Sequence, residues 1–221
     1  MWFCLISISQ VLLLKWIHPV SSSFMMSRQL HALASGDWHN RIDYRWRDLE
    51  NISSQLPLAV VASEDQRFPV HHGFDFAAIE KAYKSNLRGK KVRGASTISQ
   101  QLAKNLFLWS GRSYVRKALE AWYTFWIELL WSKKRILEVY VNVVEFGDGV
   151  YGAEAAAKRF YGTSAKALSR RQSATLAAVL PNPKIYNAVR PGPYVKRRSK
   201  AIERQMRALG GTAYLSSCCL R

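Results

Sequence analysis

The sequence predicts a mainly α-helical protein with one main domain. Its 221 residues are enough to bury one hydrophobic core, and two domains would be cramped. From Leu56 onward, apolar residues recur with helical spacing, and Val, Ile and Thr rarely alternate with polar residues as they do in strands. Thr97, followed three residues later by Gln100, has the pattern of a capping box at a helix start. Helices are therefore expected throughout the body of the chain.

The expected helices follow one another along most of the chain, separated by Gly, Pro and Ser residues that favour turns. They are expected near residues 56–67, 75–87, 97–108, 113–130, 133–145, 152–160, 164–180 and 193–209. The main domain is placed at residues 51–210, with a linker at 20–50 and a C-terminal tail at 211–221.

The N-terminus, residues 1–19, is expected to be a transmembrane signal anchor. Its apolar run is shorter than the ~20 residues that cross a bilayer. No Lys or Arg precedes the run, which favours an anchor that extends upstream of Met1. A cleaved signal peptide and a buried helix are the alternatives, but no A-x-A-like cleavage site follows Val20.

The charge of the chain indicates an anionic partner. It carries 33 Lys and Arg against 15 Asp and Glu, a formal net charge of +18. Nucleic acid, anionic lipid and a phosphorylated substrate all match this charge. Aromatic residues make up 12% of the chain, including 8 Trp, which also points to a membrane interface or a sugar ring. No zinc site is expected, because the adjacent His71 and His72 lack the spacing of zinc ligands.

The stretch E-D-Q-R-F-P-V-H-H-G-F-D at 64–75 begins with a carboxylate pair directly after the apolar run L-P-L-A-V-V-A. A carboxylate held against apolar surface has its charged form destabilised, so its pKa rises toward neutrality. Glu64 is therefore a candidate general acid or base. The alternative is an ordinary exposed helix end, and this stretch alone does not decide between the two.

Two further stretches carry polar residues that are candidates for an anion site. In R-G-K-K-V-R-G-A-S-T-I-S-Q-Q-L-A-K-N, residues 88–105, a basic loop rich in glycine leads into a helix whose unpaired N–H groups suit an anion. In R-S-Y-V-R-K-A-L-E, Arg112, Arg116 and Glu120 are spaced four apart and share one helical face with Lys117 beside them. Solvated helices use the same spacing for ordinary ion pairs. The aromatic residues at 122–131 suit either the core or the lipid headgroups.

Five ordered motifs resemble those of the peptidoglycan glycosyltransferases, in particular the monofunctional biosynthetic kind of Gram-negative bacteria. They are E-D-x-x-F-x-x-H-x-G-F-D, G-A-S-T-I-S-Q-Q-L-A-K-N, R-K-x-x-E, K-R-I-L-E-V-Y-V-N-x-x-x-F-G-x-G-x-x-G-x-E-A-A-A and L-A-A-V-L-P-N-P, over residues from about 55 to 208. The resemblance implies a lysozyme-like helical fold with a small membrane-facing jaw subdomain, here expected within residues 20–50. It also implies polymerisation of lipid II at the outer face of the cytoplasmic membrane.

The resemblance also implies roles for individual residues. Glu64 matches the general base and Glu120 the second catalytic glutamate. The expected substrate-binding residues are Asp65, Ser96, Gln100, Gln101, Lys104, Asn105, Arg112, Arg116 and Lys117, of which the cations would bind pyrophosphate. A divalent cation such as magnesium is the only cofactor suggested, and the sequence shows no ligands for it. The implied partners are lipid II, the glycan linked to polyprenyl pyrophosphate, the inner membrane and other proteins of cell-wall synthesis.

Two other classes remain as alternatives. A lysozyme-like hydrolase also uses paired carboxylates, but a neutral glycan has no pyrophosphate for a Lys and Arg cluster to hold. A nucleic-acid-binding protein would explain the charge but not a membrane anchor, and no known nucleic-acid-binding motif is present. Because S-x-x-K, S-x-N and K-T-G motifs are also absent, no transpeptidase activity is expected.

Overall fold

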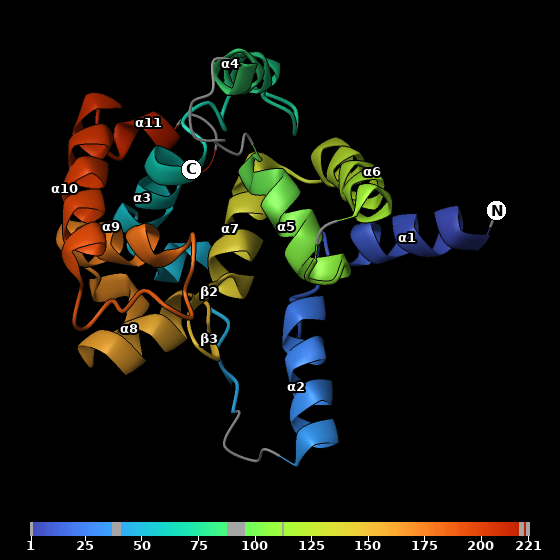
Figure 1. The fold of residues 1–221 in the computed structure, drawn as a ribbon, viewed down its shortest axis with the longest axis horizontal. Coiled ribbons are helices and arrows are strands. Elements are labelled where there is room, and N and C mark those ends of the chain that lie inside the picture. The colour runs from blue at the N-terminus through green and yellow to red at the C-terminus, as the bar shows by residue number, and fades with distance from the viewer. Residues whose placement is uncertain (1, 37–40, 88–95, 112, 217–218, 220–221) are drawn as a thin grey trace.

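The protein is mainly helical, as Figure 1 shows. The structure, a computed structural model, describes residues 2–36, 41–87, 96–111, 113–216 and 219. The described helices are α1 (Trp2–Leu13), α2 (Ser23–Ser35), α3 (Gln55–Glu64), α4 (Phe76–Leu87), α5 (Ile98–Phe107), α6 (Tyr114–Leu130), α7 (Lys133–Val143), α8 (Ala153–Tyr161), α9 (Arg170–Val179), α10 (Pro193–Ala208) and α11 (Ala213–Ser216). Short 3-10 turns lie at η1 (Leu49–Asn51) and η2 (Ala165–Ala167).

The core is built around α3 and α7, most of whose side chains are buried. Helices α9 and α10 pack on α3, while α5 packs on both α6 and α7. In Figure 1, α3, α8, α9 and α10 lie on one side and α1, α5 and α6 on the other, with α7 between them. The last residue of α3 and the first residues of α5 therefore meet near the middle of the molecule.

A small sheet lies beside this core and is tied to α2. Its strands are β1 (Asp43–Tyr44), β2 (Glu145–Gly147) and β3 (Val150–Tyr151), in the order β1–β3–β2. Strand β1 runs parallel to β3 and β2 runs antiparallel to it. Arg28 on α2 donates to Asp148, in the turn between β2 and β3, at 2.6 Å. This ion pair fixes one face of α2 against the sheet.

The predicted helices are confirmed, with two boundaries that differ by several residues. The helix predicted at 56–67 ends at Glu64, because the next side chain, Asp65, turns inward to bind other segments. The helix predicted at 164–180 begins only at Arg170, since Ser169 and Gln172 form a capping box there and η2 precedes it. Local caps decided both the existence and the start of this helix.

The two terminal segments contain structure of their own. The predicted anchor, residues 1–19, contains the twelve-residue α1, and no described helix is long and apolar enough to cross a bilayer. Helix α1 packs along α6, where Trp122 Nε1 donates to Ser7 Oγ at 3.0 Å. The predicted linker at 20–50 contains α2, β1 and η1. In the predicted tail, the Tyr214 hydroxyl donates to the Gln66 carbonyl at 2.6 Å.

Candidate active site

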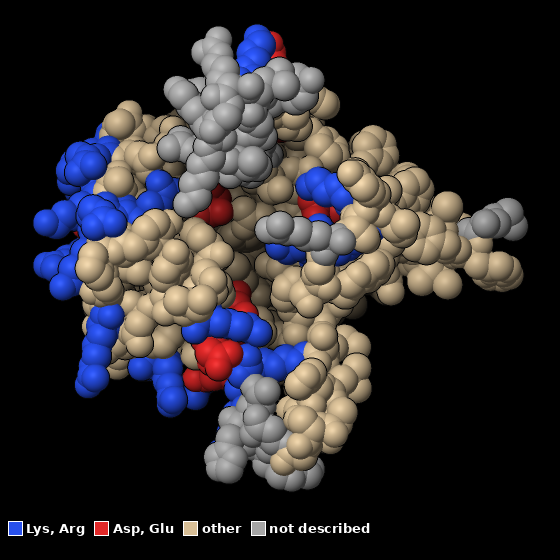
Figure 2. Space-filling model, viewed as in Figure 1, with Lys and Arg blue, Asp and Glu red and all other residues tan. Residues whose placement is uncertain are grey.

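The face seen in Figure 2 is hollowed between the part built from α3, α9 and α10 and the part built from α5, α6 and α1. Acidic and basic side chains lie along this hollow, while the surface around α1 and α6 is largely uncharged. The predicted site residues that the structure describes lie at the end of α3, on or just before α5, and in the first half of α6, which are elements that border it.

Glu64 is the last residue of α3, and its side chain is held by α5. Gln101 Nε2 donates to Glu64 Oε2 at 3.0 Å. Burial raises the pKa of Glu64, while the Gln101 hydrogen bond and the positive charge of Arg198 on α10 act in the opposite direction. A carboxylate with a raised pKa that remains within reach of solvent suits a general base. The exposed helix end considered as the alternative is therefore not what the structure shows.

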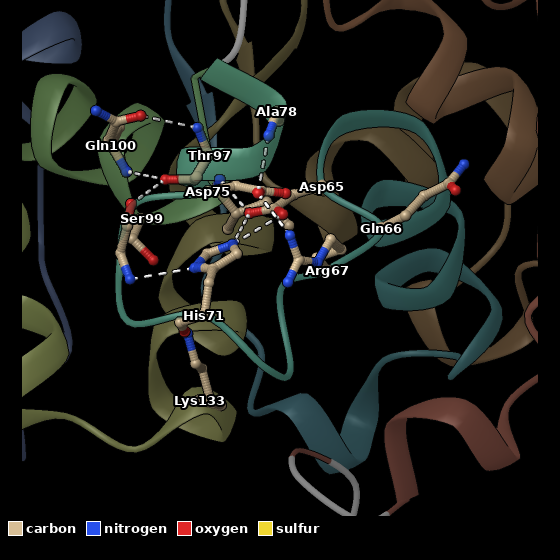
Figure 3. Close-up of polar contacts among 12 residues, drawn as sticks. Asp65, Gln66, Arg67, His71, Asp75, Ala78, Thr97, Ser99, Gln100 and Lys133 are labelled. Atoms are coloured by element: carbon tan, nitrogen blue, oxygen red, sulfur yellow. Dashed lines mark hydrogen bonds and ion pairs between the residues drawn. The ribbon is translucent and has the colours of Figure 1, made fainter. Parts of the chain in front are cut away.

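The Asp65 side chain is part of a buried network, which Figure 3 shows. Both of its carboxylate oxygens lie 2.9 Å from His71 Nε2, and one accepts from the Ile98 N–H at 3.0 Å. Because the Gly73 N–H donates to His71 Nδ1, His71 must carry its proton on Nε2 and donate it to Asp65. Asp65 thus joins the end of α3 to the start of α5. Its predicted contact with substrate stays a prediction.

The loop that follows Asp65 is held at a close approach to α6. Gly73 has a φ of 85°, and a Cβ there would lie 2.8 Å from Thr124 Cγ2. Its carbonyl accepts from Thr97 Oγ1 at 2.6 Å. Lys133 Nζ donates to the His71 carbonyl at 2.6 Å from the start of α7. The loop therefore sets where α3, α5, α6 and α7 meet beneath Glu64.

The predicted substrate-binding residues on α5 fall into two groups according to what their side chains contact. Gln100 is buried, and its side-chain oxygen accepts from the Thr97 N–H at 3.0 Å in the predicted capping box, also visible in Figure 3. Gln101 and Lys104 instead lie within the electrostatic reach of Glu64. Asn105 is half-buried, and Ser96 is exposed before the helix. The structure thus gives Gln100 a capping contact, and its predicted contact with substrate stays a prediction.

Lys104 on α5 interacts electrostatically with both predicted catalytic carboxylates. Burial lowers the pKa of its ammonium, and Glu120 and Glu64 both raise it. The cations of Arg116 and Lys117 act on the pKa of Lys104 in the same direction as burial. A half-buried lysine that faces two cations is a position where an additional anion would be stabilised.

Glu120 is buried on α6 and is bound by two cations of the same helix. Arg116 Nη1 donates to it at 2.8 Å, and Lys117 Nζ also donates to it. Arg116 Nε is buried and has no hydrogen-bond partner in the described part of the chain. A buried guanidinium N–H without a partner is costly, so a ligand oxygen would satisfy it. Arg112, the remaining predicted cation, lies outside the described residues.

The structure adds two residues that were not predicted. Tyr140 on α7 is fully buried, and its hydroxyl donates to Gln101 Oε1 at 2.7 Å. Arg198 on α10 donates to the Ser63 carbonyl at 2.9 Å, next to Glu64. Tyr140 lies in one of the ordered motifs and Arg198 in a stretch read only as a helix. Neither was given a role, because their partners are distant in sequence.

No group of three or more His, Cys, Asp or Glu side chains among the described residues is arranged to hold a metal ion. The two predicted catalytic glutamates are instead paired with an amide and with cations. The divalent cation suggested by the sequence resemblance thus stays a prediction.

Comparison with known proteins identifies the family. The family described as Transglycosylase matches residues 30–207, which contain every predicted site residue. A protein named biosynthetic peptidoglycan transglycosylase from Xanthomonas oryzae pv. oryzae is 60% identical over 213 residues, 96% of this chain and 87% of that protein. Proteins of the same name from Xanthomonas axonopodis pv. citri (97% of this chain, 87% of that protein) and Xylella fastidiosa (96% and 87%) are 59% and 57% identical. The chain therefore belongs to the transglycosylase family.

Proposed function

We propose that this transglycosylase polymerises the glycan chains of peptidoglycan. It transfers the growing glycan from undecaprenyl pyrophosphate to the 4-hydroxyl of lipid II, forms a β-1,4 linkage with inversion and releases undecaprenyl pyrophosphate. Support comes from the family, from relatives named biosynthetic peptidoglycan transglycosylase and from the arrangement of the site. The observation that carries the proposal is the half-buried Lys104, which interacts electrostatically with Glu64 and with the group formed by Glu120, Arg116 and Lys117.

Glu64 and the cations near Lys104 have separate tasks in this reaction. Glu64 takes the proton from the acceptor's 4-hydroxyl as that oxygen attacks the anomeric carbon of the donor. The bond from the anomeric carbon to the pyrophosphate breaks, and negative charge builds on the leaving group. Lys104, Arg116 and Lys117 stabilise that charge, and Arg116 Nε offers a donor that is free within the described structure. Glu120 holds Arg116 and Lys117 in place through its ion pairs.

A lysozyme-like hydrolase is the principal alternative, because its reaction also needs two carboxylates. Here both carboxylate oxygens of Glu120 already accept hydrogen bonds from cations, one from Arg116 and one from Lys117, so the group is arranged to hold these cations in place. A neutral glycan also gives no reason for an Arg116 Nε without a hydrogen-bond partner among the described residues, or for a half-buried Lys104 within the electrostatic reach of Arg116. Both observations favour a pyrophosphate leaving group.

The proposed location is the inner membrane, with the catalytic domain on the periplasmic side and the single-pass anchor at residues 1–19. The fold is proposed to be lysozyme-like, with the membrane-facing jaw within residues 20–50, which contain α2. Large apolar side chains are exposed on α1, α2 and α6. They include Trp2, Leu5, Ile6, Leu13, Met26, Leu30, Leu33, Phe125 and Leu129. Such a surface suits contact with lipid. Other proteins of cell-wall synthesis are further proposed partners.

Incubation with purified lipid II tests the reaction directly. The protein is expected to convert lipid II into a polymer that muramidase digests to disaccharide units, because the proposed product is a β-1,4 glycan. Chromatography before and after digestion separates polymer, lipid II and hydrolysis products. Release of free sugar from a preformed glycan, without polymer, would support the hydrolase instead.

The aromatic part of α6 is expected to bind membranes without the proposed anchor. A chain that begins at Ser21 should still sediment with vesicles containing anionic lipid, since the exposed side chains of Phe125 and Leu129 insert between headgroups. Phe125→Ser combined with Leu129→Ser should weaken this binding. Complete loss of binding in the chain that begins at Ser21 would show that α6 makes no membrane contact of its own.

A further inference from the structure

A chain of two hydrogen bonds leads from the core to the proposed general base. The Tyr140 hydroxyl donates to Gln101 Oε1 at 2.7 Å, and Gln101 Nε2 donates to Glu64 Oε2 at 3.0 Å. The three residues come from α7, α5 and α3. Tyr140 is completely buried, so it does not contact substrate, and any effect it has on the reaction must pass through Gln101.

The direction of this chain follows from the chemistry of each group. A primary amide has an accepting end and a donating end, and rotation by 180° exchanges them. Burial, together with the nearby carboxylates of Glu64 and Asp65, raises the pKa of Tyr140 well above its ordinary value, so its hydroxyl stays protonated. Among the described residues the only acceptor that the structure gives this buried proton is Gln101 Oε1, so the hydroxyl donates to the oxygen end of the amide. That contact leaves the NH₂ end of Gln101 to face Glu64.

The orientation of the amide decides which form of Glu64 it favours. An NH₂ group that faces a carboxyl group donates to a carboxylate and stabilises its negative charge. The opposite orientation would present the amide oxygen, which repels a carboxylate and accepts from a carboxylic acid. Without the Tyr140 hydroxyl, the amide could adopt either orientation.

We infer that Tyr140 is a positioning residue that holds the Gln101 amide with its NH₂ group toward Glu64, and so keeps Glu64 ionised and oriented to accept a proton. The inference rests on the proposed role of Glu64 as general base. Tyr140, in the stretch I-L-E-V-Y-V-N of α7, thus makes no direct contact with substrate and acts only through Gln101.

Other charged groups also face Glu64, and they are unchanged by substitution of Tyr140. Arg198 on α10 favours the carboxylate, whereas the adjacent Asp65 disfavours it. Lys104 on α5 interacts attractively with Glu64. Because these groups remain in every variant described below, a change in the titration of Glu64 reports on the hydrogen-bond chain.

Tyr140→Phe is the first test, because it removes one oxygen and leaves the ring in the core. The acidic limb of the rate of lipid II polymerisation, where Glu64 becomes protonated, is expected to move up by about one pH unit. The rate above the limb should be largely retained. NMR of the side-chain carboxyl of Glu64 in ¹³C-labelled protein should show the same upward shift, and this readout does not depend on turnover.

Tyr123→Phe is the matched control. The Tyr123 hydroxyl is also buried and also donates to a glutamine oxygen, that of Gln10, at 3.3 Å. It lies between α6 and α1 and has no part in the chain that reaches Glu64. This variant should leave the acidic limb and the titration of Glu64 in place.

Gln101→Met and the double variant with Tyr140→Phe complete the test. Gln101→Met should raise the acidic limb at least as far as Tyr140→Phe does, and the double variant should raise it no further than Gln101→Met alone. An unmoved limb, a uniform loss of rate at every pH, or additive shifts would overturn the inference. If Tyr140→Phe fails to fold, an unmoved titration of Glu64 in Gln101→Met overturns it, and a raised one supports it. Full activity of Glu64→Gln would instead reject the proposed base, while the NMR titration would still test the hydrogen-bond chain.

Discussion

Glu64→Gln is expected to lower the rate of lipid II polymerisation by about 10²-fold or more, because glutamine keeps the shape of the side chain but cannot accept a proton. Binding of lipid II should survive, since the cations around Lys104 are untouched. The polymerisation rate and the affinity for lipid II, measured on the same preparation, check both statements. A native rate in this variant would require a different base.

The melting temperature separates loss of chemistry from loss of fold. Burial raises the pKa of Glu64, so the folded protein binds this proton more tightly than the unfolded chain does. The fold therefore becomes less stable as pH rises from the pKa of Glu64 in the unfolded chain to its higher pKa in the folded protein, because the buried side chain becomes charged over this range. Glu64→Gln should melt at or above the wild-type temperature at neutral pH, with the difference vanishing below the unfolded pKa. A lower melting temperature together with lost activity would indicate a structural role.

Asp65→Asn makes the same chemical change at the neighbouring carboxylate, and it should affect stability more than polymerisation. Asp65 accepts hydrogen bonds from both His71 and the Ile98 N–H. In Asp65→Asn the new NH₂ group would face one of these two donors, and that hydrogen bond would be lost. We expect a loss of about 1–3 kcal/mol of stability and a smaller loss of polymerisation than in Glu64→Gln. A larger loss of activity in Asp65→Asn, with an unchanged melting temperature, would reverse the roles of the two carboxylates.

Lys104→Met is expected to reduce polymerisation by about 10²-fold, because it removes a cation that interacts with both Glu64 and Glu120 while keeping a side chain of similar length. The charge that builds on the pyrophosphate would then lose a donor in a partly desolvated site, where each interaction is strong. Arg116→Ala should act in the same direction. Turnover of lipid II under single-turnover conditions measures the effect on the chemical step.

Lys200→Met, on the exposed face of α10, provides the control for net charge. It removes the same charge from the molecule as Lys104→Met but from a solvated position. Polymerisation should stay near the wild-type rate in Lys200→Met. Equal losses in the two variants would show that the overall positive charge of the protein, and not the position of Lys104, supports the reaction.

The sequence by itself determined the helical class and most helix positions. Helical periodicity and end caps depend on residues three or four positions apart, as in the Thr97 and Gln100 capping box that the structure confirms. The pairing of Arg116 and Lys117 with Glu120 follows from the same spacing within one helix. The ordered motifs also identified the family, which comparison with relatives confirmed.

Only the tertiary structure decided which side chains meet across helices. Gln101 bonds to Glu64 across 37 residues, Tyr140 bonds to Gln101 across 39, and Asp65 bonds to Ile98 across 33. Periodicity places each of these residues on a face of its helix, but the packing angle and register between helices select the partner. For this reason the sequence treated Glu64 and Asp65 as one acidic pair, whereas the structure turns Glu64 toward Gln101 and Asp65 into the buried network with His71. The same packing brings Tyr140 to the amide that faces Glu64. Because the core between α3, α5 and α7 buries the Tyr140 hydroxyl completely, its hydrogen-bond partner has to come from the protein.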